Sequence, residues 1–171
     1  AIDFIKEVKD IDNTFIINLV GNRNTIKEVL QTKKIPKEIS RFLDITHASQ
    51  SITMQDRPSR IIKTKPDSSM LQSIALLKNS KVDAVVSAGN TGALLACSLF
   101  TMGLIEGIKR PTLAPYIPTK HGGFILCDVG ANLNIRPKHL LQFALMANAY
   151  IKHFKDINNP RIGLLNIGKE T

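Results

Sequence analysis

The stretch that most constrains the fold runs from Val82 to Ala96 and reads VDAVVSAGNTGALLA. It begins with a β-branched run, passes through a short turn of small and polar residues, and continues as an apolar segment too long for a strand. The pattern predicts a strand at 82–86, a tight turn at 87–92, and a helix from about 90 to 104. The first N–H groups and the positive dipole end of a helix favour an anion, and small residues let the backbone approach it. We therefore expect one wall of an anion site at this turn.

A purely structural interpretation of the same turn stays open, because Asn90 or Thr91 can simply cap the helix. The turn matches neither a Walker A loop nor the GxGxxG fingerprint, so ATP or dinucleotide binding has no motif support. It does offer the side chains of Ser87, Asn90 and Thr91 together with backbone donors. These groups suit a phosphate or a thioester carbonyl.

Strands and helices alternate along the rest of the chain. The predicted helices cover 1–10, 25–30 with Thr25 as cap, 69–79 with Ser69 and Gln72 as a capping box, and a segment beginning at Pro137; the predicted strands cover 15–20, 41–47, 110–118, 124–129 and 161–167. The alternation predicts a layered α/β fold with a mostly parallel sheet covered on both faces. Prolines make 110–118 an edge or interrupted strand, which 124–129 could pair with antiparallel. The helix at 90–104 is apolar nearly all round and is expected to be buried.

The segment 51–68 lacks a usable apolar period and carries Arg57, Arg60, Lys63 and Lys65 around a proline. It is expected to be an exposed basic loop. One interpretation is a solvated connection. The other is a clamp for an anionic substrate, because four neighbouring cations repel one another unless something negative lies close by.

In a parallel sheet the ligand lies beyond the carboxyl ends of the strands. That rule selects three strand exits, at 87–92, 128–134 and 166–169. Asp128 and Asn132 could face the same cleft, one orienting a nucleophile and the other donating to an oxyanion. Alternatively, Asp128 caps a neighbouring loop.

The chain of 171 residues carries a formal charge of +9, which indicates either anionic partners or a generally basic surface that serves solubility. Nucleic acid is not supported, because only 5% of residues are aromatic and no known binding motif is present. Histidines and cysteines show no metal-ligand spacing, and Cys97 and Cys127 are expected to be buried free thiols. No stretch is long and apolar enough for a membrane span, and no cofactor motif is found.

Four segments resemble the bacterial phosphate acyltransferase family, which uses acyl-acyl carrier protein. They read DAVVSAGNTGALLA (83–96), RPTLAPYIP (110–118), LCDVGAN (126–132) and RIGLLNIG (161–168), and the run SSM after the basic segment also fits. The resemblance covers essentially the whole chain and keeps the order of the motifs.

The resemblance implies an enzyme that transfers a fatty acyl group from acyl carrier protein to inorganic phosphate, giving acyl phosphate for phospholipid synthesis without a cofactor or metal. It implies a fold like isopropylmalate dehydrogenase and phosphotransacetylase, a homodimer, and a cytoplasmic protein at the anionic inner face of the cytoplasmic membrane. On this basis the expected phosphate and substrate residues are Ser87, Gly89, Thr91, Gly92, Arg57, Arg60, Lys63, Ser68 and Asn166, and the expected catalytic residues are Asn90, Asp128 and Asn132.

The family's N-terminal strand and second half have no counterpart in this sequence, so residues 1–171 are expected to be a single α/β domain or lobe and a fragment of about the first half. Two alternatives stay open. One is an acetyl- or butyryl-coenzyme A:phosphate transferase, and the other is a non-catalytic basic module that binds carrier protein or membrane.

Overall fold

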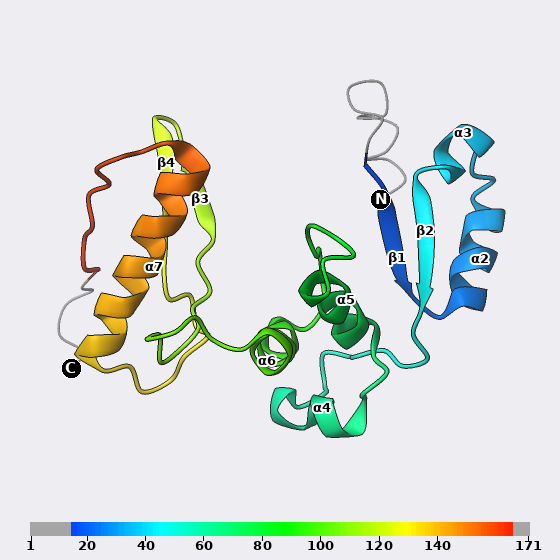
Figure 1. Ribbon diagram of the computed structural model, residues 1–171, viewed down its shortest axis with the longest axis horizontal. Helices are drawn as coiled ribbons and strands as arrows, with labels where there is room; N and C mark the ends of the chain where they lie inside the picture. The colour runs from blue at the N-terminus through cyan, green and yellow to red at the C-terminus, as the bar shows by residue number, and fades with distance from the viewer. Residues whose placement is uncertain (1–14, 166–171) are drawn as a thin grey trace. The chain divides into compact units, whose positions relative to one another are not determined.

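The computed structural model describes residues 15–165 and divides the chain into two compact units, Ala1–Gly103 and Leu104–Thr171 (Figure 1). Each unit is described by itself. The predicted helix at 1–10, the end of the strand predicted at 161–167, and Asn166 lie outside the described residues. That the whole chain forms one domain or lobe stays a prediction.

The first unit begins with a parallel strand pair linked by two helices, as the sequence predicts. In chain order these elements are β1 (Ile17–Gly21), α2 (Arg23–Thr32), α3 (Lys37–Ser40) and β2 (Leu43–His47). β1 and β2 lie side by side, with Ile17 opposite Leu43 and Gly21 opposite His47 (Figure 1). Ile39 and Phe42 form the buried centre of this part, and Phe15 stacks on Phe42 with 5.0 Å between ring centroids. Aromatic stacking and apolar burial hold the pair together.

Helix α2 begins at Arg23, two residues before the predicted start at 25. Its N-cap is Asn22 and not Thr25. The Asn22 side chain accepts hydrogen bonds from the backbone N–H groups of Asn24 and Thr25, at 3.0 and 3.2 Å. Asn and Thr both cap well, so the turn geometry after Gly21 decides between them.

Four short helical elements complete the first unit. They are η1 (Pro58–Arg60), α4 (Ile61–Thr64), α5 (Ser69–Lys78) and α6 (Thr91–Met102). Their shared core consists of Ile61, Met70, Ile74, Ala93 and Cys97, with Ile52, Leu71 and Leu94 packed against it. The expectation of an exposed loop throughout 51–68 is therefore wrong: Ile61 is fully buried, and burying it folds 58–64 into helical turns around it.

The predicted capping box at Ser69 and Gln72 is also wrong. Ser68 is the N-cap of α5 and makes no side-chain capping bond, while the Gln72 amide donates to Asp67 at 2.8 Å. A capping box needs the Gln72 carbonyl oxygen to accept a backbone N–H at the start of the helix, but the N–H groups of Ser68 and Ser69 already donate to the carbonyls of Lys65 and Gln50, at 3.1 and 3.0 Å.

Two expectations about 82–104 need correction. No described residue pairs with 82–86, which forms no strand, and Val86 is 98% exposed. A β-prone run becomes a strand only when a neighbouring strand pairs with it. Helix α6 is not buried all round, since Ala93 and Cys97 are buried whereas Leu99, Phe100 and Met102 are exposed.

The second unit is a hairpin and a long helix, namely β3 (Tyr116–Thr119), β4 (Gly122–Ile125) and α7 (Pro137–Lys155). The antiparallel pairing of β3 with β4 confirms the predicted pairing of these segments. Both strands are shorter than predicted because Pro115 has no N–H to continue the ladder. The helix begins at Pro137 as predicted and buries Phe143 and Ile151. The predicted strand at 161–167 is absent from its described part, 161–165.

The described residues therefore form a mixed α/β structure with one parallel and one antiparallel two-stranded sheet. The α/β class is confirmed. A mostly parallel sheet covered on both faces is not what these residues form.

Candidate functional site

The first turn of α6 presents free backbone donors, as the sequence predicts for this turn. The side-chain oxygen of Asn90 accepts from the N–H of Ala93 at 3.0 Å, which makes Asn90 the N-cap. No acceptor in the described part of the chain reaches the N–H groups of Thr91 and Gly92, and both residues are exposed. Together with the helix dipole, these two N–H groups favour an anion.

Asn90 is 8% exposed, and all hydrogen-bonding groups of its side chain bind other parts of the protein. Its amide nitrogen donates to the carbonyl oxygens of Thr53 and Asp56, at 3.2 Å each. Both hydrogens of the amide are therefore used, and its oxygen caps α6. In this geometry Asn90 has no donor left for a substrate oxyanion.

The segment 53–60 lies against the first turn of α6. Besides the two bonds from Asn90, Pro58 contacts Gly92 so closely that a β-carbon on Gly92 would lie 2.9 Å from the Pro58 Cγ. The segment carries Arg57 and Arg60, which are exposed and form no ion pair with any residue in 15–165. The structure thus places part of the predicted basic clamp next to the predicted anion-binding turn.

The remaining predicted residues of the first unit differ in accessibility. Lys63 lies exposed on α4 and Ser87 is exposed, with its hydroxyl accepting from the N–H of Gly89 at 3.3 Å. Ser68 is 0% exposed, and its hydroxyl has no hydrogen-bond partner among the described residues. Ser68 therefore cannot touch a ligand in this conformation, whereas the others can.

Asp128 and Asn132 lie together in the second unit and bind each other. Asp128 accepts from the Asn132 backbone N–H at 2.8 Å and from its amide at 3.2 Å, while its other oxygen accepts from the Leu113 N–H and the Thr112 hydroxyl. The Asn132 amide also donates to the carbonyl of Pro111 at 2.7 Å. The interpretation of Asp128 as a cap for a neighbouring loop is confirmed.

The electrostatics of Asp128 agree with that structural role. Burial opposes its ionisation, but the hydrogen bonds from Leu113, Asn132 and Thr112 outweigh burial and lower its pKa. A carboxylate with a lowered pKa and four donors is a weak base. Asp128 is therefore ionised near neutral pH and is poorly suited to act as a general base.

Sequence reasoning missed one residue of the first unit, Asp56. Its carboxylate accepts from Lys65 at 2.6 Å and from the Thr53 N–H at 2.6 Å. The available signal was the acidic residue directly before Arg57 in an otherwise basic run.

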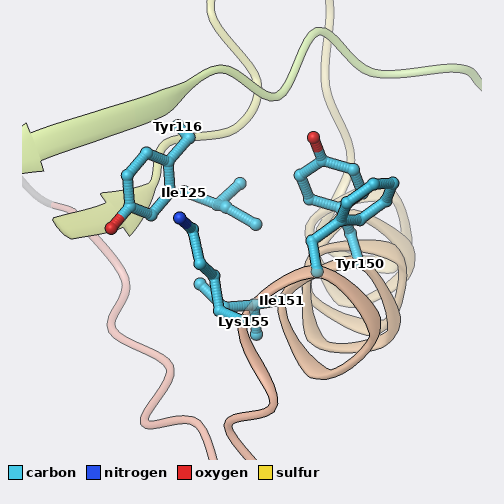
Figure 2. A pocket seen from close by; sticks show the side chains of 6 residues that line it. Tyr116, Ile125, Tyr150, Ile151 and Lys155 are labelled. Atoms are coloured by element: carbon cyan, nitrogen blue, oxygen red, sulfur yellow. The ribbon is translucent and has the colours of Figure 1, made fainter. Parts of the chain in front are cut away.

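The second unit has a cavity of about 280 Å³ between the hairpin and the end of α7. Figure 2 shows Tyr116 and Tyr150 on opposite sides of it, with Lys155 reaching toward Tyr116. The ammonium of Lys155 lies 4.6 Å from the centre of the Tyr116 ring. This cation–π contact gives Lys155 a partner within the protein.

Metal and thiol chemistry find no support among residues 15–165. No group of three His, Cys, Asp or Glu side chains in that range could hold a metal ion. Burial raises the pKa of the Cys97 and Cys127 thiols, which disfavours the nucleophilic thiolate. Within the same range no helix has the length and apolarity to cross a membrane.

Comparison with known proteins finds a match to the family described as "Fatty acid synthesis protein" over residues 3–171. The chain is 45% identical over 155 residues to a phosphate acyltransferase of Geobacillus thermodenitrificans, covering 90% of this chain and 45% of that protein. It is 43% identical over 171 residues to a phosphate acyltransferase of Halalkalibacterium halodurans, and 39% over 170 residues to a putative phosphate acyltransferase of Clostridium perfringens, covering 99% of this chain and 48% of each relative. The chain spans about half the length of these curated relatives.

Proposed function

Because the chain belongs to the fatty acid synthesis protein family, we propose that the protein is a phosphate acyltransferase that moves a fatty acyl group from acyl-acyl carrier protein to inorganic phosphate. The observation that carries the proposal is that the arginine-bearing segment 53–60 lies against the first turn of α6, in which the N–H groups of Thr91 and Gly92 are free. Both features attract a phosphate dianion.

In the proposed reaction, an oxygen of bound phosphate attacks the carbonyl carbon of the acyl thioester. The tetrahedral intermediate then collapses, the C–S bond breaks, and the carrier protein leaves as a thiolate that takes up a proton from solvent. Phosphate at neutral pH is already a nucleophile, so no side chain has to remove a proton from it.

The residues of the first unit divide into two roles in this proposal. The N–H groups of Thr91 and Gly92 and the side chains of Arg57 and Arg60 hold phosphate, with Lys63, Ser87 and Gly89 at the edge of the site. Asn90 acts as a positioning residue, because its donors are bound to Thr53 and Asp56.

Asp128 and Asn132 fix the loop at 111–113 of the second unit, and the proposal retains them as catalytic residues on the resemblance alone. The proposal retains Ser68 as a substrate residue on the resemblance alone, and Asn166 on the resemblance together with the strand exit predicted at 166–169. It also retains the isopropylmalate dehydrogenase-like fold, the homodimer and the cytoplasmic location, which rest on the resemblance alone. Contact with an anionic membrane surface rests on the resemblance and on the +9 charge.

The +9 charge agrees with an acidic carrier protein as the acyl donor, but the choice of this donor rests on the resemblance alone. Acyl transfer from acetyl- or butyryl-coenzyme A is the second candidate, since coenzyme A is also anionic. A non-catalytic basic module is the third.

The test is acyl-phosphate formation from long-chain acyl-acyl carrier protein and phosphate, assayed with the 171-residue chain and with the complete protein. Phosphate-dependent loss of thioester in the complete protein supports the proposal. Transfer from coenzyme A thioesters alone favours the second candidate, and binding of carrier protein without thioester loss favours the third.

A further inference from the structure

We propose that Asp56 and Lys65 are positioning residues whose ion pair holds Arg57 beside the first turn of α6 for phosphate binding. This inference rests on the proposed function. It adds two residues that touch neither phosphate nor acyl donor but decide where the phosphate-binding arginine lies.

One carboxylate oxygen of Asp56 gathers three donors. The Lys65 ammonium donates to it at 2.6 Å, the Thr53 N–H at 2.6 Å and the Thr53 hydroxyl at 3.0 Å. The same ammonium donates to the carbonyl of Ser51 at 2.7 Å. The hydrogen bond from Lys65, followed by those from Thr53, lowers the pKa of Asp56. The carboxylate is therefore ionised at neutral pH and ties residues 51–56 to the end of α4.

The pair is more enclosed than an ordinary surface ion pair. The side chain of Asp56 is 22% exposed and that of Lys65 is 26% exposed. Exposed ion pairs contribute little to stability because solvent screens the charges and both side chains must be ordered. Here four hydrogen bonds fix the two groups, so the pair can define the path of the chain.

The backbone of Asp56 connects the pair to the candidate site. Its carbonyl oxygen accepts from the buried Asn90 amide, and two residues later Pro58 touches Gly92. Arg57 stands between these two anchored residues. Its backbone is thereby held at the first turn of α6, and only its side chain remains to be ordered by phosphate.

The ion pair also affects whether Arg57 can bind an anionic ligand. Asp56 is the carboxylate nearest in sequence to Arg57, and an Asp56–Arg57 pair would neutralise the arginine. Lys65 pairs with Asp56 instead, through the one carboxylate oxygen that also accepts from Thr53, and Arg57 forms no ion pair with any described residue. The arrangement keeps a positive charge unneutralised for an anionic ligand.

The experiment compares Asp56→Asn with Asp67→Asn in the complete protein. Asp67 is a matched control from the same unit, because its carboxylate accepts from the Ser49 N–H and the Gln72 amide, and neither donor belongs to 53–60. Its pKa is also lowered, by the hydrogen bonds from Ser49 and Gln72. Both variants lose carboxylate hydrogen bonds of one unit, but only Asp56→Asn releases the arginine segment.

We expect Asp56→Asn to raise the KM for phosphate about tenfold with kcat within about twofold, and Asp67→Asn to leave that KM within about twofold. Lys65→Met should raise the KM for phosphate as much as Asp56→Asn does, whereas Lys65→Arg, which keeps a cation for Asp56, should retain most of the phosphate affinity. In the double variant Asp56→Asn/Lys65→Met the KM for phosphate should be no higher than in either single variant. Equal KM changes in Asp56→Asn and Asp67→Asn, or additive effects in the double variant, overturn the inference.

Tryptic cleavage after Arg60 gives a readout that does not depend on activity. Faster cleavage in Asp56→Asn than in Asp67→Asn supports a held segment, and equal rates overturn it. Faster cleavage with an unchanged KM for phosphate overturns the positioning role while the proposed function stands. An unaltered complete protein that forms no acyl phosphate overturns the proposed function and with it the phosphate role of the pair, whatever the cleavage rates.

Discussion

A β-carbon built on Gly92 would lie 2.9 Å from the Cγ of Pro58, which is closer than carbon atoms pack without moving. The contact joins the first turn of α6 to the segment that carries Arg57 and Arg60. Glycine is therefore required at this position by packing and not by backbone conformation. The proposed phosphate site depends on how closely these two segments approach.

Gly92→Ala should push Pro58 away from α6 and weaken phosphate binding. Overpacking of this kind costs roughly 1–3 kcal/mol, and 1.4 kcal/mol corresponds to a tenfold change in affinity. We expect the KM for phosphate to rise about tenfold, measured by initial rates at saturating acyl donor. Gly163→Ala is the control, since a β-carbon there meets nothing within 4 Å. An unchanged KM in Gly92→Ala would show that the contact does not shape the site.

Asn90 allows its cap and its tether to be separated. Asn90→Asp keeps an oxygen for the Ala93 N–H but loses the donors to Thr53 and Asp56 and places a carboxylate against two carbonyls. Asn90→Ala loses both functions, and the cap alone is worth about 1 kcal/mol. If the tether positions the arginine segment, both variants should raise the KM for phosphate.

Urea unfolding separates the two contributions of Asn90. A normal KM in Asn90→Asp, with a stability loss confined to Asn90→Ala, would reduce Asn90 to a helix cap. Similar KM increases in both variants would support the tether.

The helices could be predicted from local sequence patterns. Pro137 at the first position of α7 and the apolar spacing after it are local signals, and the structure confirms them. The strand predicted at 82–86 failed for a nonlocal reason, because β-branched residues indicate a preference whereas pairing requires a second strand that brings its own donors and acceptors. The same reason applies to 161–165.

The candidate site shows a similar division between local and nonlocal information. Sequence identified Asn90 and Asp128 as groups suited to binding and predicted the turn that carries Thr91 and Gly92. It could not show that the hydrogen-bonding groups of Asn90 and Asp128 are already committed to the protein. The donors that remain free are the backbone N–H groups of the first turn of α6, which the turn-and-helix pattern did predict.

Asp128→Asn should destabilise the second unit at neutral pH and remove part of its acid sensitivity. The folded-state pKa of Asp128 is below its usual value of 3.8, so its contribution is present above that pH and is lost as the pH falls through the folded-state pKa. Leaving a buried donor unsatisfied costs about 1–3 kcal/mol. The free energy of unfolding, measured with denaturant, should therefore differ less between pH 7 and pH 3 in the variant than in the unaltered chain. Glu106→Gln, at an exposed position, is the control; equal pH dependence of all three proteins would contradict the role of Asp128.

His139 should make the second unit sensitive to acid in a different pH range. Its ring is 6% exposed, and its Nδ1 accepts from the Arg136 N–H at 3.1 Å, so the folded state holds the neutral form. Burial, followed by the charges of Arg110, Lys138 and Arg136, lowers its pKa. The unfolded chain then binds the proton more readily than the folded one. Stability should fall as the pH drops through the ordinary value of 6.5 toward the lower folded-state pKa.

Denaturant unfolding measured between pH 7.5 and pH 5.5 checks the role of His139. His139→Gln should make the free energy of unfolding less dependent on pH, because glutamine can still accept from the Arg136 N–H but does not titrate. His121→Gln, in the exposed turn between β3 and β4, should leave the dependence unchanged. If the unaltered chain loses no stability over this range, the neutral buried histidine is not what limits the acid tolerance of the second unit. If His121→Gln flattens the curve as much as His139→Gln does, the effect belongs to the general charge of the chain and not to the capping contact at Arg136.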